Sequence, residues 1–335
     1  MINSQNNISM QDTITQLRLV LGERLKVHEP LNRYTTFKVG GPADFFYEAK
    51  TKDELISAIT IARKVGLPIF ILGGGTNILI GDKGIRGFVI KNSTQGIAIR
   101  GVRGSMESGS SKRTVYVEAE SGVSINKLVR FTIEEGLSGL QMHLGLPGSV
   151  GGAIYMNSKW TKPEGYVGDA VYQALVLTPN GDLKQVTRDF FDFSYDFSAI
   201  QKTGDIVVSV TFALIVDTKE HLWEIANGSI GYRRETQPQG VFSAGCTFKN
   251  ISKATAMMAS TPNLTTSAGF LVDNAGLKGE RIGDAQISTV HANFIVNLKN
   301  ATAADVVTLI EKAKNAVKKK FGVTLEEELI RVGEF

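Results

Sequence analysis

The stretch that most constrains the fold is a largely apolar run at 67–72, followed directly by Gly73-Gly74-Gly75-Thr76-Asn77. A buried strand that feeds a glycine-rich turn brings main-chain amides together with no Cβ atom in the way, and such a turn can cradle an anion. Several N–H donors aimed at one spot suit a diphosphate, and Thr76 and Asn77 can add side-chain hydrogen bonds. We interpret the turn as the phosphate seat of a cofactor, although three glycines after a strand can also form an ordinary tight loop.

A second glycine-rich segment lies at 145–154 and places four glycines within eight residues beside Pro147. It lacks the Lys-Ser/Thr pair of a P-loop, and neither glycine segment has the GxGxxG spacing of a dinucleotide-binding fold. These residues exclude the nucleoside-triphosphate and Rossmann classes. The backbone here must approach something closely, either a ligand or another part of the protein.

Length and net charge independently limit the number of domains and the class of ligand that this chain can have. With 335 residues and 42% hydrophobic content, the chain can bury large cores, and its length predicts two or three domains. The net charge of +4 is small and the basic residues are dispersed, which argues against nucleic-acid binding but suits a small anionic substrate. We expect no nucleic-acid or membrane partner, and a monomer.

Other classes lack the residues they need. No apolar stretch approaches the roughly 20 residues that span a bilayer, and the first residues have neither a basic region nor an apolar core, so we expect a cytoplasmic protein. One cysteine cannot form an intrachain disulfide, and four scattered histidines offer no ligand spacing. We expect no metal site.

Hydrophobic periodicity and turn residues predict an α+β chain. We expect helices at 12–24, 52–65, 125–135, 221–230, 268–274 and 303–320, the second of them capped by Thr51. We expect strands at 45–48, 69–72, 87–91, 115–119, 174–177, 184–186, 206–216, 294–297 and 325–332. Asn180-Gly181 signals a hairpin turn, and the glycine-, serine- and charge-rich residues 100–112 predict an exposed loop.

Several segments resemble, in order and spacing, the UDP-N-acetylenolpyruvoylglucosamine reductase family, also called UDP-N-acetylmuramate dehydrogenases. They are residues 34–43, 73–79, 145–157, 243–250, and 275–279 taken with 291–294. The resemblance runs from about Val27 to Gly333. It implies an FAD-dependent oxidoreductase of peptidoglycan precursor synthesis that acts on UDP-N-acetylglucosamine enolpyruvate, with non-covalent FAD and NADPH as cofactors.

The resemblance also implies a fold. It is a three-domain FAD-binding α+β fold of the vanillyl-alcohol-oxidase/PCMH type. Residues 1–92 would hold an N-terminal helix and the first FAD-binding subdomain, 93–238 the second, and 239–335 a substrate-binding α+β domain. The short distance from Cys246 to the C-terminus leaves little room for a substrate-covering insertion, and this resembles the shorter, type II architecture of the family.

In the implied reaction, NADPH delivers a hydride to FAD, which passes it to the β-carbon of an enolpyruvyl ether. The protein must stabilise the resulting enolate and supply one proton. Cys246 stands where the family places its proton-donating serine or cysteine, and a thiol of pKa about 8.5 is mostly protonated near neutrality. Taken alone, a single cysteine is more often a small buried hydrophobe.

Glu328 is the second catalytic candidate, because the register counted back from Gly333 matches the family's glutamate. Taken alone, Glu326-Glu327-Glu328 would read as an exposed charge run. Strand alternation puts Glu326 and Glu328 on one face and predicts Glu327 as the most solvated of the three.

The resemblance assigns further residues to ligands. Those expected to bind the cofactor are Gly40, Gly73, Gly74, Gly75, Thr76, Asn77, Gly145, Gly148, Ser149, Gly152 and Arg234. Those expected to bind the substrate are Lys249, Asn250 and His291. Arg234 could instead interact with the last carbonyls of a helix. His143 could contact the flavin, but a satisfied, partly buried histidine is the favoured interpretation.

The chain departs from the family pattern at Asp196, where the family has an arginine that helps to stabilise the enolate. A carboxylate facing an anionic substrate would repel it. Either Asp196 turns away and a cation such as Lys202, Arg233 or Lys249 replaces the arginine, or turnover is impaired. Residues 158–160 also depart, since they replace a small-residue turn.

Three hypotheses follow from these residues. The first is a working reductase, and the second is a flavin- or nucleotide-sugar-binding relative whose turnover Asp196 impairs. The third is an oxidase, which is weakened because oxidases of this fold commonly tether the flavin through a histidine, and the first glycine turn contains none. The presence of both Cys246 and Glu328 favours catalysis.

Overall fold

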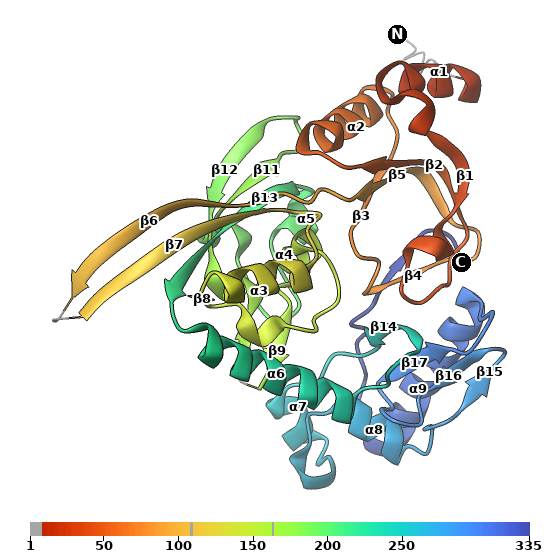
Figure 1. The fold of residues 1–335 in the computed structure, drawn as a ribbon. Helices are drawn as coiled ribbons and strands as arrows, with labels where there is room; N and C mark the ends of the chain where they lie inside the picture. Colours follow the sequence, from red (N-terminus) through yellow and green to blue (C-terminus); the bar gives the residue numbers. More distant parts are fainter. Residues whose placement is uncertain (1–8, 108–109, 163) are drawn as a thin grey trace.

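The computed structural model describes residues 9–107, 110–162 and 164–335. Its N-terminal part contains a four-stranded sheet in the order β1-β2-β5-β3 (Figure 1). The elements are α1 (Met10–Leu21), β1 (Lys26–Pro30), β2 (Pro42–Ala49), α2 (Lys52–Lys64), β3 (Ile69–Leu72), β4 (Ile78–Ile80) and β5 (Ile85–Asn92). The predicted helix cap is confirmed, because the Thr51 hydroxyl accepts a hydrogen bond from the Glu54 amide at 3.2 Å. β2, β5 and β3 run parallel, so the first glycine turn leaves the carboxyl edge of this sheet.

The middle of the chain forms a six-stranded antiparallel sheet in the order β12-β11-β13-β7-β6, with β8 paired to β13. Its strands are β6 (Ile97–Glu107), β7 (Ser110–Glu120), β8 (Leu137–Ser138), β11 (Val171–Leu177), β12 (Leu183–Thr187) and β13 (Ile206–Val216). The other elements are α3 (Ile125–Glu134), α4 (Val150–Met156), the hairpin β9 (Lys159–Thr161) and β10 (Glu164–Tyr166), α5 (Ile200–Thr203) and α6 (Lys219–Thr236).

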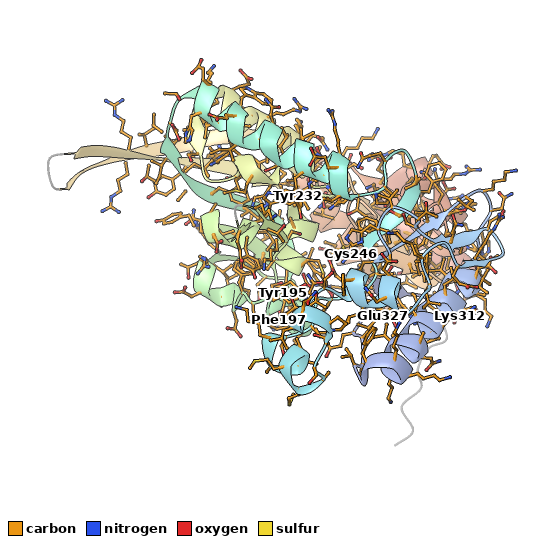
Figure 2. The ribbon with its side chains drawn as sticks, turned by 90° about the horizontal axis from the view of Figure 1, so that it is seen from below. Tyr195, Phe197, Tyr232, Cys246, Lys312 and Glu327 are labelled. Atoms are coloured by element: carbon orange, nitrogen blue, oxygen red, sulfur yellow. The ribbon has the colours of Figure 1, made fainter. Side chains whose placement is uncertain are left out.

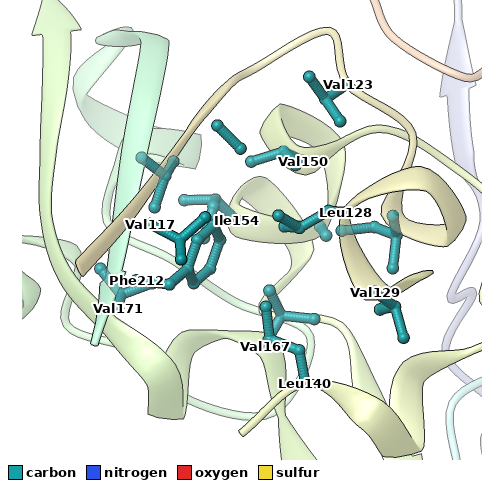
Figure 3. Packing of buried hydrophobic residues seen from close by; sticks show 14 of the residues in the cluster. Val117, Val123, Leu128, Val129, Leu140, Val150, Ile154, Val167, Val171 and Phe212 are labelled. Carbon is teal, nitrogen blue, oxygen red and sulfur yellow. The ribbon is translucent and has the colours of Figure 1, made fainter. Parts of the chain in front are cut away.

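One hydrophobic cluster holds this middle part together (Figure 3). Phe212 of β13 and Val117 of β7 supply sheet side chains, and Leu128 of α3 and Ile154 of α4 cover them. The glycine-rich segment therefore continues into helix α4, which the sequence did not predict. Burial of its apolar side chains offsets the poor helix propensity of the two glycines in its first turn.

The expectation of an exposed loop at 100–112 is wrong. Residues 97–107 and 110–120 pair as the antiparallel strands β6 and β7, which project from the body as a long ribbon (Figure 1). Side chains at 99–104 of β6 are mostly exposed, as Val102 illustrates with 62% of its surface exposed, whereas Val117 at the other end of the ribbon is buried in the middle core. Main-chain pairing defines the strands at 100–107 without the apolar alternation that correctly predicted the strand at 115–119. Residues 108 and 109 lie outside the described part.

The C-terminal part combines a second four-stranded sheet, in the order β14-β17-β16-β15, with three helices. Its elements are β14 (Phe242–Cys246), α7 (Lys253–Met258), α8 (Ala268–Asn274), β15 (Arg281–Ile282), β16 (Ala285–Ile287), β17 (Phe294–Asn297), α9 (Ala303–Phe321) and β18 (Ile330–Val332). The last strand is shorter than the predicted 325–332. Residues 325–329 instead run beside the segment after Cys246, bridged at Phe248 and Glu327.

Strand β18 returns to the N-terminal part, where it pairs in parallel with β4. The largest hydrophobic clusters are centred on the N-terminal, middle and C-terminal parts, which supports the division at 92 and 238 as a proposal. Phe37, Val39 and Leu79 nevertheless pack into the C-terminal cluster. In the described ranges, none of the helices is both long and apolar enough to cross a membrane.

Candidate active site

The two glycine-rich segments meet in the folded chain. A Cβ atom added to Gly74 would lie 2.7 Å from the Cα of Gly148, and one added to Gly148 would lie 3.0 Å from the Thr76 hydroxyl oxygen. Gly75 has φ +64° and its Cα faces the carbonyl of Tyr34. Only glycine allows two backbones to approach this closely, so the sequence signal of both segments is explained by one junction.

This junction carries main-chain donors with no protein acceptor. Within the described ranges, the amides of Gly74, Gly75, Thr76 and Asn77 donate no hydrogen bond to the chain. Unpaired amides gathered at a glycine turn are what a bound diphosphate requires. The residues present therefore fit an FAD diphosphate. Lys91, which the sequence reasoning missed, adds a largely buried ammonium that donates to the carbonyl of Gly73.

Other predicted cofactor residues have structural tasks instead. The Gly145 amide donates to the Asn126 side chain at 2.6 Å, and the Gly152 amide donates to the Ser149 hydroxyl, which caps α4, at 3.3 Å. Gly40 has φ +134°, and a Cβ atom there would strike the Ile80 side chain at 2.8 Å. Their donors and surfaces are used within the protein, so we propose that they shape the junction.

The catalytic candidates lie on two segments joined by hydrogen bonds. The Glu328 amide donates to the carbonyl of Thr247, the neighbour of Cys246, at 2.8 Å. The Asn77 side-chain amide donates to the Glu328 carbonyl at 3.2 Å, and the Ile330 amide donates to the Asn77 carbonyl at 3.0 Å. Cys246, Glu328 and the first glycine turn are thus brought together from three distant parts of the sequence.

Electrostatics favour the protonated forms of these groups. Burial raises the pKa of the Cys246 thiol far above its usual value, and the nearby Glu328 and Asp196 carboxyls raise it further. Burial and Asp196 raise the pKa of Glu328 to about 8, with Lys249 opposing them. Thiol and carboxyl therefore both hold protons near neutrality. A contact from the Asn293 side chain and the charge of Arg233 partly offset the shift at Cys246.

Asn293 is a residue that the sequence reasoning did not single out. Its side-chain oxygen accepts from the Phe248 amide at 2.9 Å and its side-chain nitrogen donates to the Phe248 carbonyl at 2.8 Å. Its own carbonyl accepts from the Thr247 amide at 2.7 Å. Asn293 thereby fixes the backbone that carries Cys246. A single polar contact of this kind gives no periodic signal in a sequence.

The arginine of α6 that lies at the site is Arg233, whereas Arg234 is exposed. Arg233 stacks on Trp160 with 4.1 Å from its guanidinium carbon to the ring centroid, and its charge reaches Cys246. Burial lowers the pKa of Arg233 to about 10. The expectation for Arg234 thus gives way to a proposal for Arg233, because α6 stays helical to Thr236 and turns the two side chains apart.

Asp196 does not turn out to solvent. Only 8% of its surface is exposed, and its Oδ2 atom is buried without a hydrogen-bond partner. It lies within electrostatic reach of Glu328 and Cys246, and its neighbour Tyr195 accepts a hydrogen bond from the Asn250 amide at 3.4 Å. Figure 2 shows Tyr195 and Cys246 in the same region. The departure from the family pattern therefore falls inside the site.

Three cations were named as replacements for the missing arginine. Lys249 lies close enough to influence both Asp196 and Glu328, and Arg233 influences Cys246. Lys202 instead lies over the ring of Phe197, 4.8 Å from its centroid. A cation that was not named is Lys159, which also acts on Asp196. It comes from the irregular segment at 158–160, which forms the hairpin β9–β10.

The remaining predicted residues have mixed outcomes. Asn250 uses its side-chain oxygen to accept from the Ala268 amide at 3.1 Å. Burial lowers the pKa of His291, and its Nδ1 atom accepts from the Asn293 amide at 3.2 Å, so this histidine is neutral and structurally engaged. The expectation of a satisfied, partly buried His143 is wrong. It is fully buried, both ring nitrogens lack partners, and burial lowers its pKa to about 4.

The order of solvation in the acidic run is also corrected. Glu327, predicted to be the most solvated, pairs with Arg331 at 2.7 Å and with Lys314 at 2.5 Å. Glu326 is the exposed member of the three. The reason is that 325–329 is not a regular strand, so alternation does not apply.

The junction of glycine turns and the protonated thiol and carboxyl beside it define an FAD-dependent oxidoreductase with an α+β fold. Residues 43–187 match the family model described as an FAD binding domain. Residues 237–332 match the model of the UDP-N-acetylenolpyruvoylglucosamine reductase C-terminal domain.

Relatives with similar sequences match this chain over nearly its whole length. UDP-N-acetylenolpyruvoylglucosamine reductases of Lachnoclostridium phytofermentans and Halalkalibacterium halodurans are each 35% identical, covering 98% and 97% of this chain and 98% and 100% of their own lengths. The crystal structure of the reductase from Thermus caldophilus is 32% identical, with a TM-score of 0.70 over 92% of this chain and 98% of that chain. The chain belongs to the UDP-N-acetylenolpyruvoylglucosamine reductase family.

Proposed function

We propose that this chain is an NADPH-dependent flavoenzyme that reduces the enolpyruvyl ether of UDP-N-acetylglucosamine to UDP-N-acetylmuramate, a step of peptidoglycan precursor synthesis. The observation that carries the proposal is the main-chain hydrogen bonding of Glu328 to both Thr247 and Asn77, which supports an acid pair beside the proposed diphosphate cradle. Family membership supports the substrate, and the match to an FAD binding domain supports the cofactor.

When bound at the glycine turns, FAD would supply hydride-transfer chemistry between NADPH and the β-carbon of the substrate. The residues of this chain then stabilise the negative charge and donate the proton. Hydride addition leaves negative charge at the α-carbon, delocalised into the carboxylate, and the Cys246 thiol donates its proton to that carbon. Glu328 keeps a second proton at the site, and Arg233 and Lys249 supply positive charge for the enolate and the substrate's anionic groups.

The proposed ligand contacts follow the geometry. The amides of Gly74 to Asn77 would hold the FAD diphosphate, with Gly73, Gly148 and Ser149 shaping the other side of the cradle. Lys249, Asn250 and His291 remain proposed as substrate-side residues. A monomeric, cytoplasmic enzyme without nucleic-acid or membrane partners completes the proposal.

The test is anaerobic stopped-flow spectroscopy on the purified protein with its bound flavin. NADPH should bleach the flavin, and UDP-N-acetylglucosamine enolpyruvate should restore its absorbance and yield UDP-N-acetylmuramate. A colourless protein that refuses added FAD would contradict the proposal. In a second run with air and no substrate, rapid reoxidation of the reduced flavin would also contradict it, because it indicates an oxidase.

The alternative of a binding protein with impaired turnover rests on the buried Asp196 carboxyl inside the site. It predicts that NADPH reduces the flavin but that the sugar nucleotide binds without reoxidising it. Normal reoxidation removes this alternative.

A further inference from the structure

The turn that carries Asp196 fixes the direction of its side chain. The Ser194 amide donates to the Phe197 carbonyl at 3.1 Å, and the Phe197 amide donates back to the Ser194 carbonyl at 3.3 Å. Asp196 sits in this turn with φ +52°, and its carbonyl accepts from the Gln201 side chain at 3.1 Å. The left-handed backbone is costly for most residues but tolerated by aspartate, so the surrounding hydrogen bonds hold the carboxyl in one place.

The Asn157 side chain anchors the same turn from the end of α4, donating to the Ser194 carbonyl at 3.0 Å. Asn157 thus links the Asp196 turn to the helix that continues the second glycine segment. The position of the carboxyl is therefore built into the scaffold that forms the cofactor cradle, and is not a chance orientation of a surface loop.

The buried carboxyl has no ion-pair partner within 4.0 Å in the part of the chain that the structure describes. Lys159, the cation on the nearby hairpin, is engaged elsewhere. Its Nζ atom lies 3.1 Å from Glu164 and 5.6 Å from the centroid of the Tyr195 ring. Burying an ionised carboxylate without a close cation is costly, and protonation is the cheaper solution.

Several titratable groups face Asp196 from the elements packed around it. They are Tyr195 from its own turn, Cys246 of β14, Lys249 from the segment after it, Glu328 from the segment before β18, and Lys159 of β9. Burial raises the pKa of Asp196, the two lysines and Tyr195 oppose the shift, and its coupling to Glu328 keeps two negative charges from forming side by side.

We propose that Asp196 works as a neutral carboxylic acid whose unpartnered oxygen donates a hydrogen bond to the carboxylate of the enolpyruvyl group. This inference rests on the proposed function, since it names a residue that binds the same substrate. A neutral acid does not repel an anion, and its hydrogen bond strengthens as negative charge builds on the enolate. Asp196 then takes the place of the family's arginine: its protonated carboxyl oxygen donates a hydrogen bond where the arginine would supply a positive charge.

The protonation state can be tested without any turnover. Infrared difference spectra of the FAD-bound protein between pH 6 and pH 10 should contain a protonated-carboxyl carbonyl band that is missing in Asp196→Asn. A Glu328→Gln variant removes the other buried carboxyl of the site and should keep the Asp196 band. If Asp196→Asn removes no such band, Asp196 is ionised and the inference is wrong, whether or not the enzyme turns over.

The binding role is tested by titrating the oxidised protein with the enolpyruvyl sugar nucleotide and following the flavin spectrum. The amide of Asp196→Asn donates a hydrogen bond at every pH, so its affinity should stay near the wild-type value at pH 6 and lack the alkaline decline that we expect of the wild type. Asp196→Ala should bind about tenfold more weakly at pH 6.

Either of two outcomes overturns the binding role. In the first, the affinity of Asp196→Asn for the sugar nucleotide keeps the same pH dependence as that of the wild type. In the second, Asp196→Ala binds the sugar nucleotide as tightly as the wild type does at pH 6. If the wild-type protein binds no sugar nucleotide at all, the proposed function fails, while the infrared result still decides the protonation of Asp196. Reduction of the flavin by NADPH serves as the folding control for every variant.

Discussion

The side chain of Asn77 donates to the main-chain carbonyl of Glu328 at 3.2 Å, although the two residues are 251 positions apart. The Ile330 amide returns a hydrogen bond to the Asn77 carbonyl at 3.0 Å. The turn that we expect to hold the FAD diphosphate is therefore hydrogen-bonded to the backbone that carries Glu328, the proposed catalytic carboxyl. Asn77 thus contributes two of the hydrogen bonds that hold the cofactor seat beside the segment of Glu328.

Removing this tie should separate the two half-reactions. Asn77→Ala removes the donor to Glu328 without adding charge beside the diphosphate cradle, and one lost hydrogen bond of about 1 kcal/mol corresponds to roughly a fivefold effect. We expect flavin reoxidation by the substrate to slow by about five- to tenfold, with reduction by NADPH changed less. Stopped-flow traces of both half-reactions measure this, and an equal loss in both would mean that Asn77 acts on the cofactor alone.

The close approach of the two glycine turns predicts loss of FAD in Gly74→Ala. The added methyl group would lie 2.7 Å from the Cα of Gly148, backbone against backbone, so the turns must move apart. We expect the purified variant to be largely colourless and its FAD dissociation constant to rise at least about tenfold. Gly101→Ala on β6 is the matched control, because its added methyl group meets nothing within 4 Å. It should bind FAD as the wild type does.

The sequence could predict the parts of the site that depend on local backbone chemistry. Clustered glycines identified both turns, and the resemblance to the family assigned Cys246 and Glu328 to one site. Register along a helix was harder. Arg233 and Arg234 are adjacent in sequence but point roughly 100° apart, and only the phase of α6 tells which one meets Cys246.

Properties that arise from tertiary surroundings could not be predicted. The ion pairs of Glu327 depend on Arg331 and on Lys314 from α9, which pattern analysis of the acidic run does not include. Residues 99–104 of β6 are mostly exposed, so this part of the ribbon gives no apolar period that predicts a strand. The burial of Asp196 depends on a turn whose hydrogen bonds involve Asn157 and Gln201.

Cys246→Ala should leave flavin reduction by NADPH intact and slow reoxidation by the substrate about a hundredfold or more, since the proton donor is lost. Cys246→Ser should retain part of the rate, because a hydroxyl can donate a proton but is less acidic than a thiol. Stopped-flow absorbance of the flavin measures both. Full-speed reoxidation in Cys246→Ala would remove the acid role from this thiol.

Glu328 should make stability depend on pH in an unusual direction. Its pKa is raised to about 8 in the folded protein, against about 4.3 in an unfolded chain. The stabilisation is therefore fully present below pH of about 4.3 and is lost as pH rises to about 8, because the unfolded state ionises first. Glu328→Gln cannot ionise. Its melting temperature should exceed the wild type's by about 3 °C or more at pH 9, with little difference at pH 4.5.

The matched control for this prediction is Glu326→Gln, two residues away on the exposed side. It should shift the melting temperature by less than about 1 °C at both pH values. Differential scanning calorimetry of the FAD-bound proteins gives the comparison. A Glu328→Gln advantage that is the same at both pH values would show that the carboxyl is not held protonated.

The two neighbouring arginines of α6 offer a test in which each variant controls for the other. Arg233→Met removes the guanidinium that stacks on Trp160 and acts on Cys246. The negative charge of the enolate then lacks a nearby cation that stabilises it in a largely buried site. We expect reoxidation of the flavin by the substrate to fall about ten- to a hundredfold, while Arg234→Met, at an exposed position, should change it less than about twofold. Single-turnover kinetics of both variants decide between them. If Arg234→Met shows the larger loss, α6 must rotate or unwind when the ligands bind, and the assignment returns to Arg234.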